Sequence, residues 1–160
     1  MIDLSIGVDI VSIDRIKNIL QSQKGTRFKH RVFTESEIAY CQDRGRAASH
    51  HFAGRFAAKE AVKKAILSKG ENQGPWFKEI EISSRQDGAP IVHLPKPYHS
   101  KYHCECSISH DGDSAISFAL MQKNNAVYYL LSIKGVRQNC YLKIWDIGKD
   151  PYGQCRRPGC

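Results

Sequence analysis

The sequence predicts an α+β fold in which a small antiparallel sheet packs against helices, with one long helix at its centre. Three observations predict it. Residues 2–10 alternate apolar with polar or small side chains, which is the period of a β-strand. Residues 52–66 are rich in alanine and contain no proline, as expected of a helix. Residues 77–94 and 104–121 each hold two strand-like runs joined by a turn, the pattern of a β-hairpin.

The first helix is expected directly after the N-terminal strand. Ser12 can cap this helix, and Gly25 is expected to close it. Its apolar side consists of Ile13, Ile16, Ile19 and Leu20. The basic stretch that follows, residues 24–31, is interpreted either as a solvated loop or as a docking surface for an acidic partner.

Two further helices have recognisable ends. The residues Thr34-Glu-Ser-Glu37 have the form of a capping box, so a short helix is expected from about Glu35 to Arg44. The long helix has Ser49 as a suitable N-cap and Gly70 as its stop.

Charge and length favour one domain with a basic extension. Residues 1–122 are predicted to form the domain, and residues 123–160 a C-terminal extension of unknown role that is partly disordered. The net charge is +8; the extension carries seven Lys or Arg against two Asp, which leaves +3 for the domain. A mildly basic domain fits an acidic protein or a phosphorylated small molecule and does not predict nucleic-acid binding.

Cellular location and thiol state follow from absent signals. No apolar run reaches the ~20 residues needed to span a membrane, so no membrane association is expected. The N-terminus enters a strand without a secretory signal, which predicts a cytoplasmic protein, with an organelle such as the mitochondrion as the alternative. The six cysteines show no CxxC pair, which favours free thiols over a disulfide framework or a zinc site.

Two carboxylates stand where burial would be costly. Glu60 shares a helix face with two aromatic residues and with Lys64, at intervals of four residues. Asp9 lies in the apolar run Gly-Val-Asp-Ile-Val of the first strand, where aspartate is uncommon. One divalent cation such as Mg2+ would compensate both charges. The alternatives are a simple ion pair between Glu60 and Lys64 and a capping role for Asp9, for which Ser12 is better placed.

Three separated stretches then carry motifs that occur together. Residues 6–16 begin with Gly-x-Asp-Ile in a strand, residues 53–65 contain Lys-Glu-Ala in a helix with a lysine three residues after that alanine, and residues 107–119 form the last hairpin. In these motifs the chain resembles the holo-[acyl-carrier-protein] synthases over residues 1 to about 122. The resemblance implies a 4'-phosphopantetheinyl transferase-like fold. It also implies transfer of 4'-phosphopantetheine from coenzyme A to a serine of apo acyl carrier protein, which releases adenosine 3',5'-bisphosphate.

The resemblance implies a role for each matching residue. Asp9 and Glu60 would bind Mg2+ beside the pyrophosphate of coenzyme A, where charge must be neutralised during attack on the β-phosphorus. Lys64 would reach a phosphate or the leaving oxygen. The coenzyme site would be formed by Arg55, Lys64, Ser109 and His110.

The general base and the docking surface are implied in the same way. Glu60, Lys64 and His110 are the candidate catalytic residues; His110 has a suitable pKa for accepting the serine proton, although a carboxylate or a metal-bound water would serve equally. The alternative for His110 is a turn histidine that satisfies nearby backbone groups. His50 and His51 are interpreted as helix-start residues and not as zinc ligands. Carrier-protein binding would fall to Arg15, Arg27 and Phe28.

The sequence also leads to an expectation about the oligomeric state and to two alternative functions. The similarity suggests a homotrimer with its active site at a subunit interface, acting on a carrier of fatty-acid or polyketide synthesis. The main rival is a non-catalytic basic module that binds an acidic protein or RNA through Arg15, Arg27 and the extension. A second rival is another Mg2+-dependent phosphoryl-transfer enzyme. The carboxylates Asp9 and Glu60 favour an enzyme, because charge attraction alone does not need them.

Overall fold

The computed structural model describes residues 3–124 and confirms the α+β fold. In chain order its elements are β1 (Leu4–Ser12), α1 (Ile13–Gln21), α2 (Gly25–Val32), α3 (Glu35–Gln42), the 3-10 helix η1 (Gly45–Ala47), α4 (Ala48–Leu67), the 3-10 helix η2 (Phe77–Glu79), β2 (Glu81–Ser84), β3 (Pro90–His93), α5 (Tyr98–Lys101), β4 (Tyr102–Asp111) and β5 (Ser114–Lys123). All but the first two residues of the expected extension lie outside the described part, so its boundary and role stay predictions. None of the described helices is both long and apolar enough to cross a membrane.

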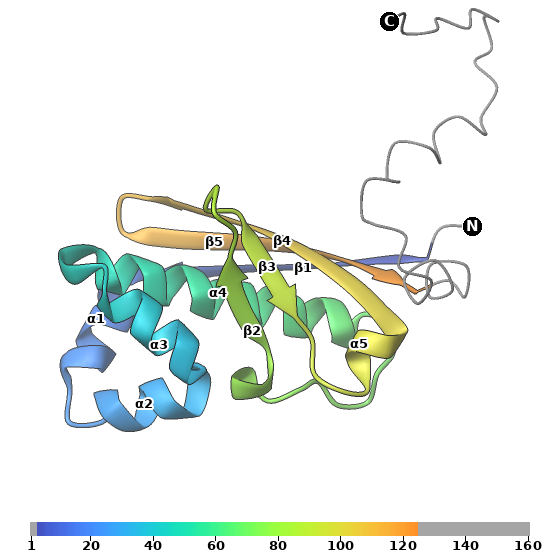
Figure 1. Ribbon diagram of the computed structural model, residues 1–160, viewed down its shortest axis with the longest axis horizontal. Helices are drawn as coiled ribbons and strands as arrows, with labels where there is room; N and C mark the ends of the chain where they lie inside the picture. The colour runs from blue at the N-terminus through green and yellow to red at the C-terminus, as the bar shows by residue number, and fades with distance from the viewer. Residues whose placement is uncertain (1–2, 125–160) are drawn as a thin grey trace, which may run out of the picture. The chain divides into compact units, whose positions relative to one another are not determined.

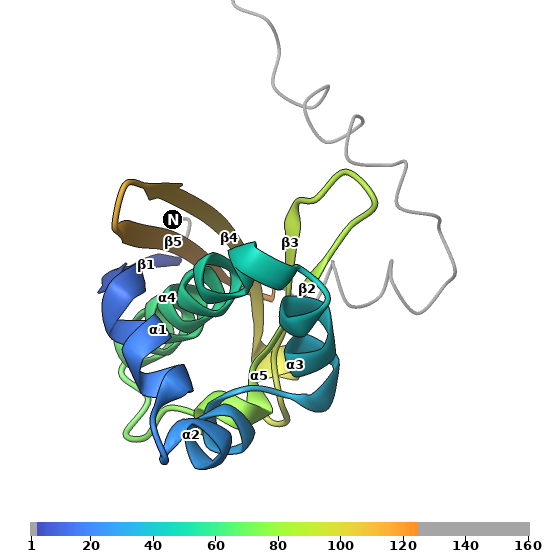
Figure 2. The ribbon, with the colours of Figure 1, turned by 90° about the vertical axis from the view of Figure 1, so that its left-hand side faces the viewer.

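The long helix α4 lies along one face of a three-stranded antiparallel sheet (Figure 1). The strand order is β1-β5-β4, with β5 in the centre, and β2 and β3 form a separate hairpin that packs beside β4. Figure 2, which looks roughly along α4, shows the sheet on one side of the helix and the hairpin on another. Both hairpins predicted from the sequence are therefore confirmed.

Strand β1 approaches α4 unusually closely. A Cβ atom added to Gly7 would lie 1.9 Å from the backbone oxygen of Ala61, a distance no side chain tolerates. Two residues earlier, the Ser5 hydroxyl donates a 2.8 Å hydrogen bond to the backbone oxygen of Ala65. Small or polar side chains therefore line the face of β1 that meets the helix, and Asp9 is next in this series.

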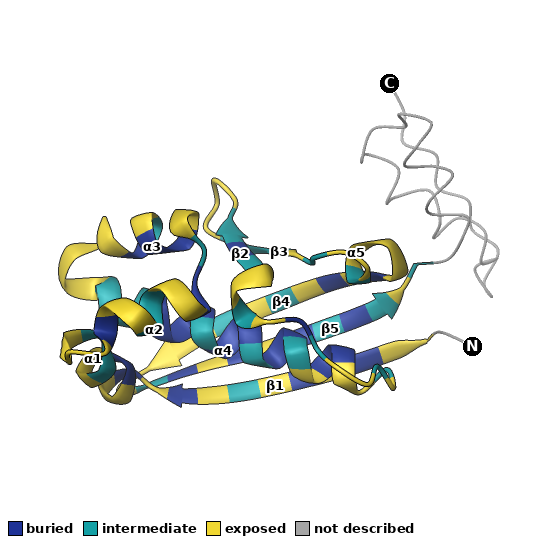
Figure 3. Cartoon of the chain, turned by 90° about the horizontal axis from the view of Figure 1, so that it is seen from below, coloured by how far each residue is buried: buried dark blue, intermediate teal, exposed yellow. Residues whose placement is uncertain are grey.

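Exposed residues alternate with buried or partly buried ones along β1 (Figure 3). The strand itself is confirmed, but the apolar side chains that define its alternation are exposed: Leu4 by 47%, Ile6 by 52%, Val8 by 45% and Ile10 by 65%. On the neighbouring strand β5, Phe118 lies opposite Val8 and Ile116 lies opposite Ile10, and both are more than 40% exposed. The described subunit thus leaves a contiguous apolar sheet face uncovered.

The first two helices differ in part from the expectation. Ser12 caps α1, as predicted, by accepting a hydrogen bond from the Arg15 amide. The helix ends at Gln21, and Gly25 begins α2 instead of closing α1. Position 25 requires glycine, because a Cβ there would lie 2.1 Å from the backbone oxygen of Leu20. The loop interpretation of residues 24–31 is wrong, since Gly25–Val32 is helical.

The predicted ends of the later helices are confirmed in part. The capping box on Thr34 is confirmed at the start of α3, which ends at Gln42. The prediction that Ser49 caps the long helix is wrong. Helix α4 begins at Ala48, so Ser49 lies inside it, and the N-cap residue Ala47 makes no side-chain hydrogen bond. Gly70, with φ of +82°, follows the last turn as expected of a helix stop.

A fully buried ion pair joins the helices to the β2–β3 hairpin. The Lys59 Nζ atom lies 2.6 Å from a Glu37 carboxylate oxygen, and both side chains are almost inaccessible to solvent. The same amino group donates to the backbone oxygens of Val32, Phe77 and Ile80. Glu37 in turn accepts hydrogen bonds from the backbone amides of Thr34 and Ile82. Burial of these charges is tolerable because nearly every hydrogen-bonding position is filled.

The three cysteines within the described residues are free thiols, as expected. Burial raises the pKa of Cys41 to about 11, of Cys104 to about 12 and of Cys106 to about 11. These thiols are therefore protonated at neutral pH and poor nucleophiles.

The buried pair predicts a large effect of removing Lys59. Lys59→Met should lower the free energy of unfolding by about 3–5 kcal/mol, because the Glu37 carboxylate would be left buried without its counter-charge. Urea denaturation followed by circular dichroism measures this loss. The exposed control Lys17→Met should change the free energy by less than about 0.5 kcal/mol. Equal stabilities of the two variants would contradict the role given to the pair.

Candidate active site

The structure brings Asp9 of β1 to the face of α4 that carries Lys64. The Lys64 Nζ atom lies 2.8 Å from the Asp9 carboxylate and also donates a 3.0 Å hydrogen bond to the backbone oxygen of Val8. Lys64 therefore pairs with Asp9, and no ion pair between Lys64 and Glu60 forms in the described chain. The Asp9 carboxylate is largely shielded, whereas the lysine side chain is half exposed.

Glu60 completes this cluster. Its side chain is half-buried on α4, and burial raises the pKa of its carboxyl group. The Asp9 carboxylate raises this pKa further, while Lys64, Lys63 and Arg15 lower it. Asp9 and Glu60 are therefore close enough for their charges to repel each other, a repulsion that a bound cation would relieve.

The chemistry of this cluster fits Mg2+ better than zinc. The two carboxylates offer hard oxygen ligands. The described residues contain no group of three or more His, Cys, Asp or Glu side chains placed to hold a metal. Mg2+ is commonly held by one or two carboxylates together with water and substrate phosphates, so two carboxylates suffice if a phosphate ligand completes the set.

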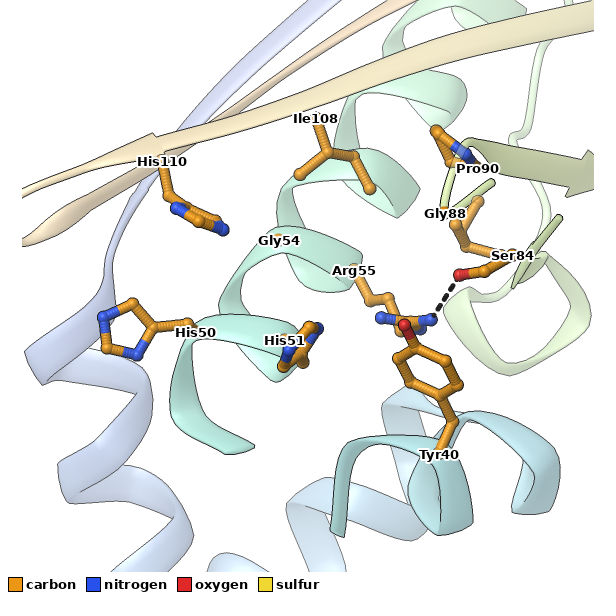
Figure 4. A pocket seen from close by; sticks show the side chains of 11 residues that line it. Tyr40, His50, His51, Gly54, Arg55, Ser84, Gly88, Pro90, Ile108 and His110 are labelled. Atoms are coloured by element: carbon orange, nitrogen blue, oxygen red, sulfur yellow. Dashed lines mark hydrogen bonds between the residues drawn. The ribbon is translucent and has the colours of Figure 1, made fainter. Parts of the chain in front are cut away.

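A second cluster surrounds a cavity of about 160 Å3 on another side of α4 (Figure 4). Two residues expected to bind coenzyme A, Arg55 and His110, line it. Arg55 is 5% exposed; it donates a 3.1 Å hydrogen bond to the Ser84 hydroxyl and stacks 3.9 Å from the centre of the Tyr40 ring. Elements α3, α4, β4 and the β2–β3 hairpin all contribute to the lining.

Two buried nitrogen atoms in this pocket have no hydrogen-bond partner. They are the Nδ1 atom of His50 and the Nε atom of Arg55, and no other buried side-chain nitrogen or oxygen atom in the described part of the chain is unpartnered. Arg55 also forms no ion pair with any carboxylate of the described residues. A buried guanidinium without a counter-charge is costly, so the pocket is suited to an anion.

The remaining candidate residues lie outside the pocket. Ser109 is exposed next to His110 but does not line the pocket. Arg15 and Arg27 are exposed on α1 and α2. Phe28 is half-buried, with its ring centre 5.9 Å from that of Phe56 on α4.

The described residues therefore form two separate clusters of candidate site residues. Asp9, Glu60 and Lys64 form the first, and none of them lines the pocket that contains Arg55 and His110.

Sequence reasoning missed several pocket residues. Tyr40, Ser84 and Pro90 come from separate elements and share no spacing that would reveal a site. His50 and His51 were expected only as helix-start residues, yet both line the cavity. Their adjacency to Arg55 on one helix was the available signal.

Comparison with known proteins settles the family. A family model described as the 4'-phosphopantetheinyl transferase superfamily matches residues 5–119. The chain belongs to this superfamily. It is 41% identical over 119 residues to the holo-[acyl-carrier-protein] synthase of Chlorobaculum parvum, covering 74% of this chain and 98% of the relative. The synthase of Wolbachia pipientis wMel is 42% identical over 119 residues, with 73% and 92% covered.

Solved structures of this transferase superfamily share the fold. The ACPS–CoA complex of Chronobacterium ammoniagenes matches with a TM-score of 0.65 and 29% identity, covering 77% of this chain and 99% of that one. The holo-[acyl-carrier-protein] synthase of Helicobacter pylori in complex with coenzyme A matches with a TM-score of 0.59 and 35% identity, covering 74% and 99%. The α+β transferase-like fold expected from the sequence is thereby confirmed.

The coupling between the two carboxylates predicts a measurable shift. In Asp9→Asn the pKa of Glu60 should fall toward its usual range, because a repelling charge is removed and Lys64 loses its partner. A pH titration of the Glu60 side-chain carboxyl carbon by NMR measures this change. Asp14→Asn, which removes an exposed carboxylate on α1, should leave the titration unchanged. An unaltered Glu60 titration in Asp9→Asn would show that the two carboxylates are not neighbours.

Proposed function

We propose that this chain is a Mg2+-dependent holo-[acyl-carrier-protein] synthase. It would transfer 4'-phosphopantetheine from coenzyme A to a serine of apo acyl carrier protein and release adenosine 3',5'-bisphosphate. The observation that carries the proposal is the electrostatic coupling of Asp9 and Glu60, from two distant segments, in a member of the 4'-phosphopantetheinyl transferase superfamily. The complexes of related synthases with coenzyme A support the choice of donor.

The first cluster provides charge for the transfer step. The serine oxygen forms a bond to the β-phosphorus, the bond from that phosphorus to the leaving phosphate breaks, and the serine proton must pass to a base. Asp9 and Glu60 would hold Mg2+, which when bound neutralises charge on the pyrophosphate. Lys64 is half exposed and already within this cluster, so it is placed to turn toward a phosphate or the leaving oxygen. A deprotonated Glu60 is required, and the cation would offset the effects that raise its pKa.

The second cluster supplies an anion site for the coenzyme. Arg55 presents a buried guanidinium with a free Nε atom, which a phosphate oxygen would satisfy. His110 lines the same cavity, and Ser109 stands beside it on β4. If His110 accepts the serine proton, it must do so from a neighbouring subunit or after closure, because within one subunit it belongs to a different cluster from Glu60.

Exposed basic residues form the proposed docking surface for the carrier. Arg15 and Arg27 lie on the consecutive helices α1 and α2, and Phe28 adds a half-buried aromatic group next to them. Complementary charge steers such encounters and weakens with salt. A fatty-acid or polyketide carrier is the acceptor class, and the cytoplasm stays a prediction.

The exposed sheet face supports assembly into a homotrimer. Six large apolar side chains on β1 and β5 are 42% or more exposed: Leu4, Ile6, Val8, Ile10, Ile116 and Phe118. Such a patch on a soluble domain is typically covered by another chain.

A mass assay tests the proposed activity. Incubation with coenzyme A, Mg2+ and apo carrier protein should add one phosphopantetheine mass to the carrier. Glu60→Gln should slow this transfer by at least about 100-fold, since a metal ligand is lost, while thermal unfolding stays nearly unchanged. Glu79→Gln, an exposed residue of η2 whose amide oxygen can still cap Trp76, should keep full activity.

Three outcomes would count against the proposal. Unmodified carriers across several types would favour the binding-module rival. Modification of the carrier when ATP replaces coenzyme A would favour another phosphoryl-transfer enzyme. Full activity of Glu60→Gln with Mg2+ would show that Glu60 is not a metal ligand.

The assembly is tested separately. Ile6→Lys should convert a three-chain particle into single chains, because a charge in the centre of an apolar interface costs several kcal/mol. Size-exclusion chromatography with light scattering measures the particle mass. Trp76→Lys places the same charge at a residue that is 73% exposed outside the sheet and should leave the mass unchanged. A single-chain mass of the unaltered protein would contradict the trimer.

A further inference from the structure

The buried Lys59 side chain connects the long helix α4 to the helix that carries part of the proposed docking surface. Its amino group contacts the Glu37 carboxylate and the backbone oxygens of Val32, Phe77 and Ile80 at distances of 2.6 to 2.9 Å. Val32 is the last residue of α2, so the lysine charge lies at the negative end of that helix. Among the described residues, the bond from Lys59 to Val32 is the only hydrogen bond that joins α2 to α4.

A row of aromatic rings makes a second connection from Lys59 to α2. The Lys59 Nζ atom lies 5.5 Å from the centre of the Phe33 ring. The Phe33 ring meets the Phe28 ring edge-on, with 5.9 Å between the ring centres, and the Phe28 ring lies 5.9 Å from that of Phe56 on α4. Phe28 is one of the residues proposed for docking. An unbroken series of contacts therefore leads from the buried lysine to the docking surface.

Helix α2 needs such contacts to hold its place. It is only eight residues long, and of these only Gly25 and Val32 are buried. Its N-cap residue, Lys24, makes no side-chain hydrogen bond. A helix this short is not stable without tertiary contacts. The position of α2 therefore depends on its packing against α1 and η2 and on the link to Lys59.

Stability alone does not explain an ion pair at this place. A buried ion pair is often no more stabilising than apolar residues of similar volume. Its hydrogen bonds, in contrast, are directional. Here they fix the end of α2, the first turn of α3, η2 and the residue before β2 at set distances from one atom of α4. The network around Lys59 is therefore suited to determining where α2 lies.

We propose that Lys59 is a positioning residue for carrier recognition, which holds α2 so that Arg27 and Phe28 present one fixed surface to the carrier protein. The inference rests on the proposed function, which supplies the carrier as the partner of this surface. Arg27 lies in the first turn of α2 and directly precedes Phe28, so a displacement of the helix moves both contacts at once. Charge and shape complementarity between two proteins depend on such fixed distances.

Donor binding and the chemical step should be little affected by the loss of Lys59. Neither Lys59 nor any residue that its amino group contacts lines the pocket that contains Arg55. Glu60 follows Lys59 in the sequence, but a helix turns by about 100° per residue, so its carboxylate lies in other surroundings and is coupled to Asp9. Removing the lysine should therefore raise the KM for the carrier much more than it lowers kcat.

Steady-state transfer assays with varied apo carrier protein test this difference between KM and kcat. Lys59→Met removes the ammonium group, and Phe33→Leu removes the ring between Lys59 and Phe28 while it leaves the ion pair intact. Each variant should raise the carrier KM at least about fivefold and change kcat by less than about threefold. The Kd of coenzyme A, measured by calorimetry, should change by less than about twofold. Circular dichroism fixes a temperature at which the variants are folded; if Lys59→Met does not fold, Phe33→Leu decides.

Met121→Ala is the matched control for lost stability. Met121 is fully buried on β5, in the core cluster that contains neither Val32 nor Phe33. Its truncation destabilises the domain without removing a contact of α2. This variant should lower the Tm and leave the carrier KM unchanged within about twofold.

The carrier KM of the variants decides between positioning and a general contribution to stability. An unchanged carrier KM in the folded variants, or an equal rise in Met121→Ala, would overturn the inference and leave the proposed function standing. Weakening of carrier and coenzyme A binding by the same factor would also overturn it, because it would show that Lys59 supports the whole domain alike. If the unaltered protein transfers nothing from coenzyme A to any carrier, the proposed function fails and the inference with it.

Discussion

The close approach of β1 to α4 is the contact on which the rest of the structure depends. It requires Gly7, because any larger residue would collide with the backbone of Ala61. The same register sets Asp9 beside the helix face that carries Glu60. Three consecutive residues of α4 then have three different surroundings: Lys59 is anchored in the core by Glu37, the pKa of Glu60 is raised by the charge of Asp9, and Ala61 lies beneath the glycine. A helix turns by about 100° per residue, so adjacent side chains reach separate surroundings.

The same contact explains why the apolar face of the sheet is left open. With Ser5, Gly7 and Asp9 turned toward α4, the alternating side chains of Leu4, Ile6, Val8 and Ile10 lie on the other face of the strand. The carboxylate cluster and the anion pocket are separate, since neither Asp9 nor Lys64 lines the pocket. An assembly that covers the sheet face would bury the exposed apolar area.

Much of the fold could be predicted because its signals are local. Alternation, capping boxes and turn residues identify strands, helix starts and hairpins without reference to the rest of the chain. The meeting of Asp9 and Glu60 could be anticipated because each is costly where it stands. Period-two alternation, however, does not tell which face of a strand is buried, and the helical state of residues 24–31 comes from packing on neighbouring elements. The partner of Lys59 and the lining of the anion pocket involve segments with no fixed spacing in the sequence, so only the folded chain reveals them.

Paramagnetic line broadening by Mn2+, which prefers the same oxygen ligands as Mg2+, tests most directly whether two distant carboxylates hold one cation. With coenzyme A present, substoichiometric Mn2+ should broaden the backbone amide signals around Asp9 and Glu60 first and together. Broadening that starts at other acidic residues, such as Asp87 on the β2–β3 turn, or that reaches Asp9 and Glu60 at different metal concentrations, would contradict a shared metal site.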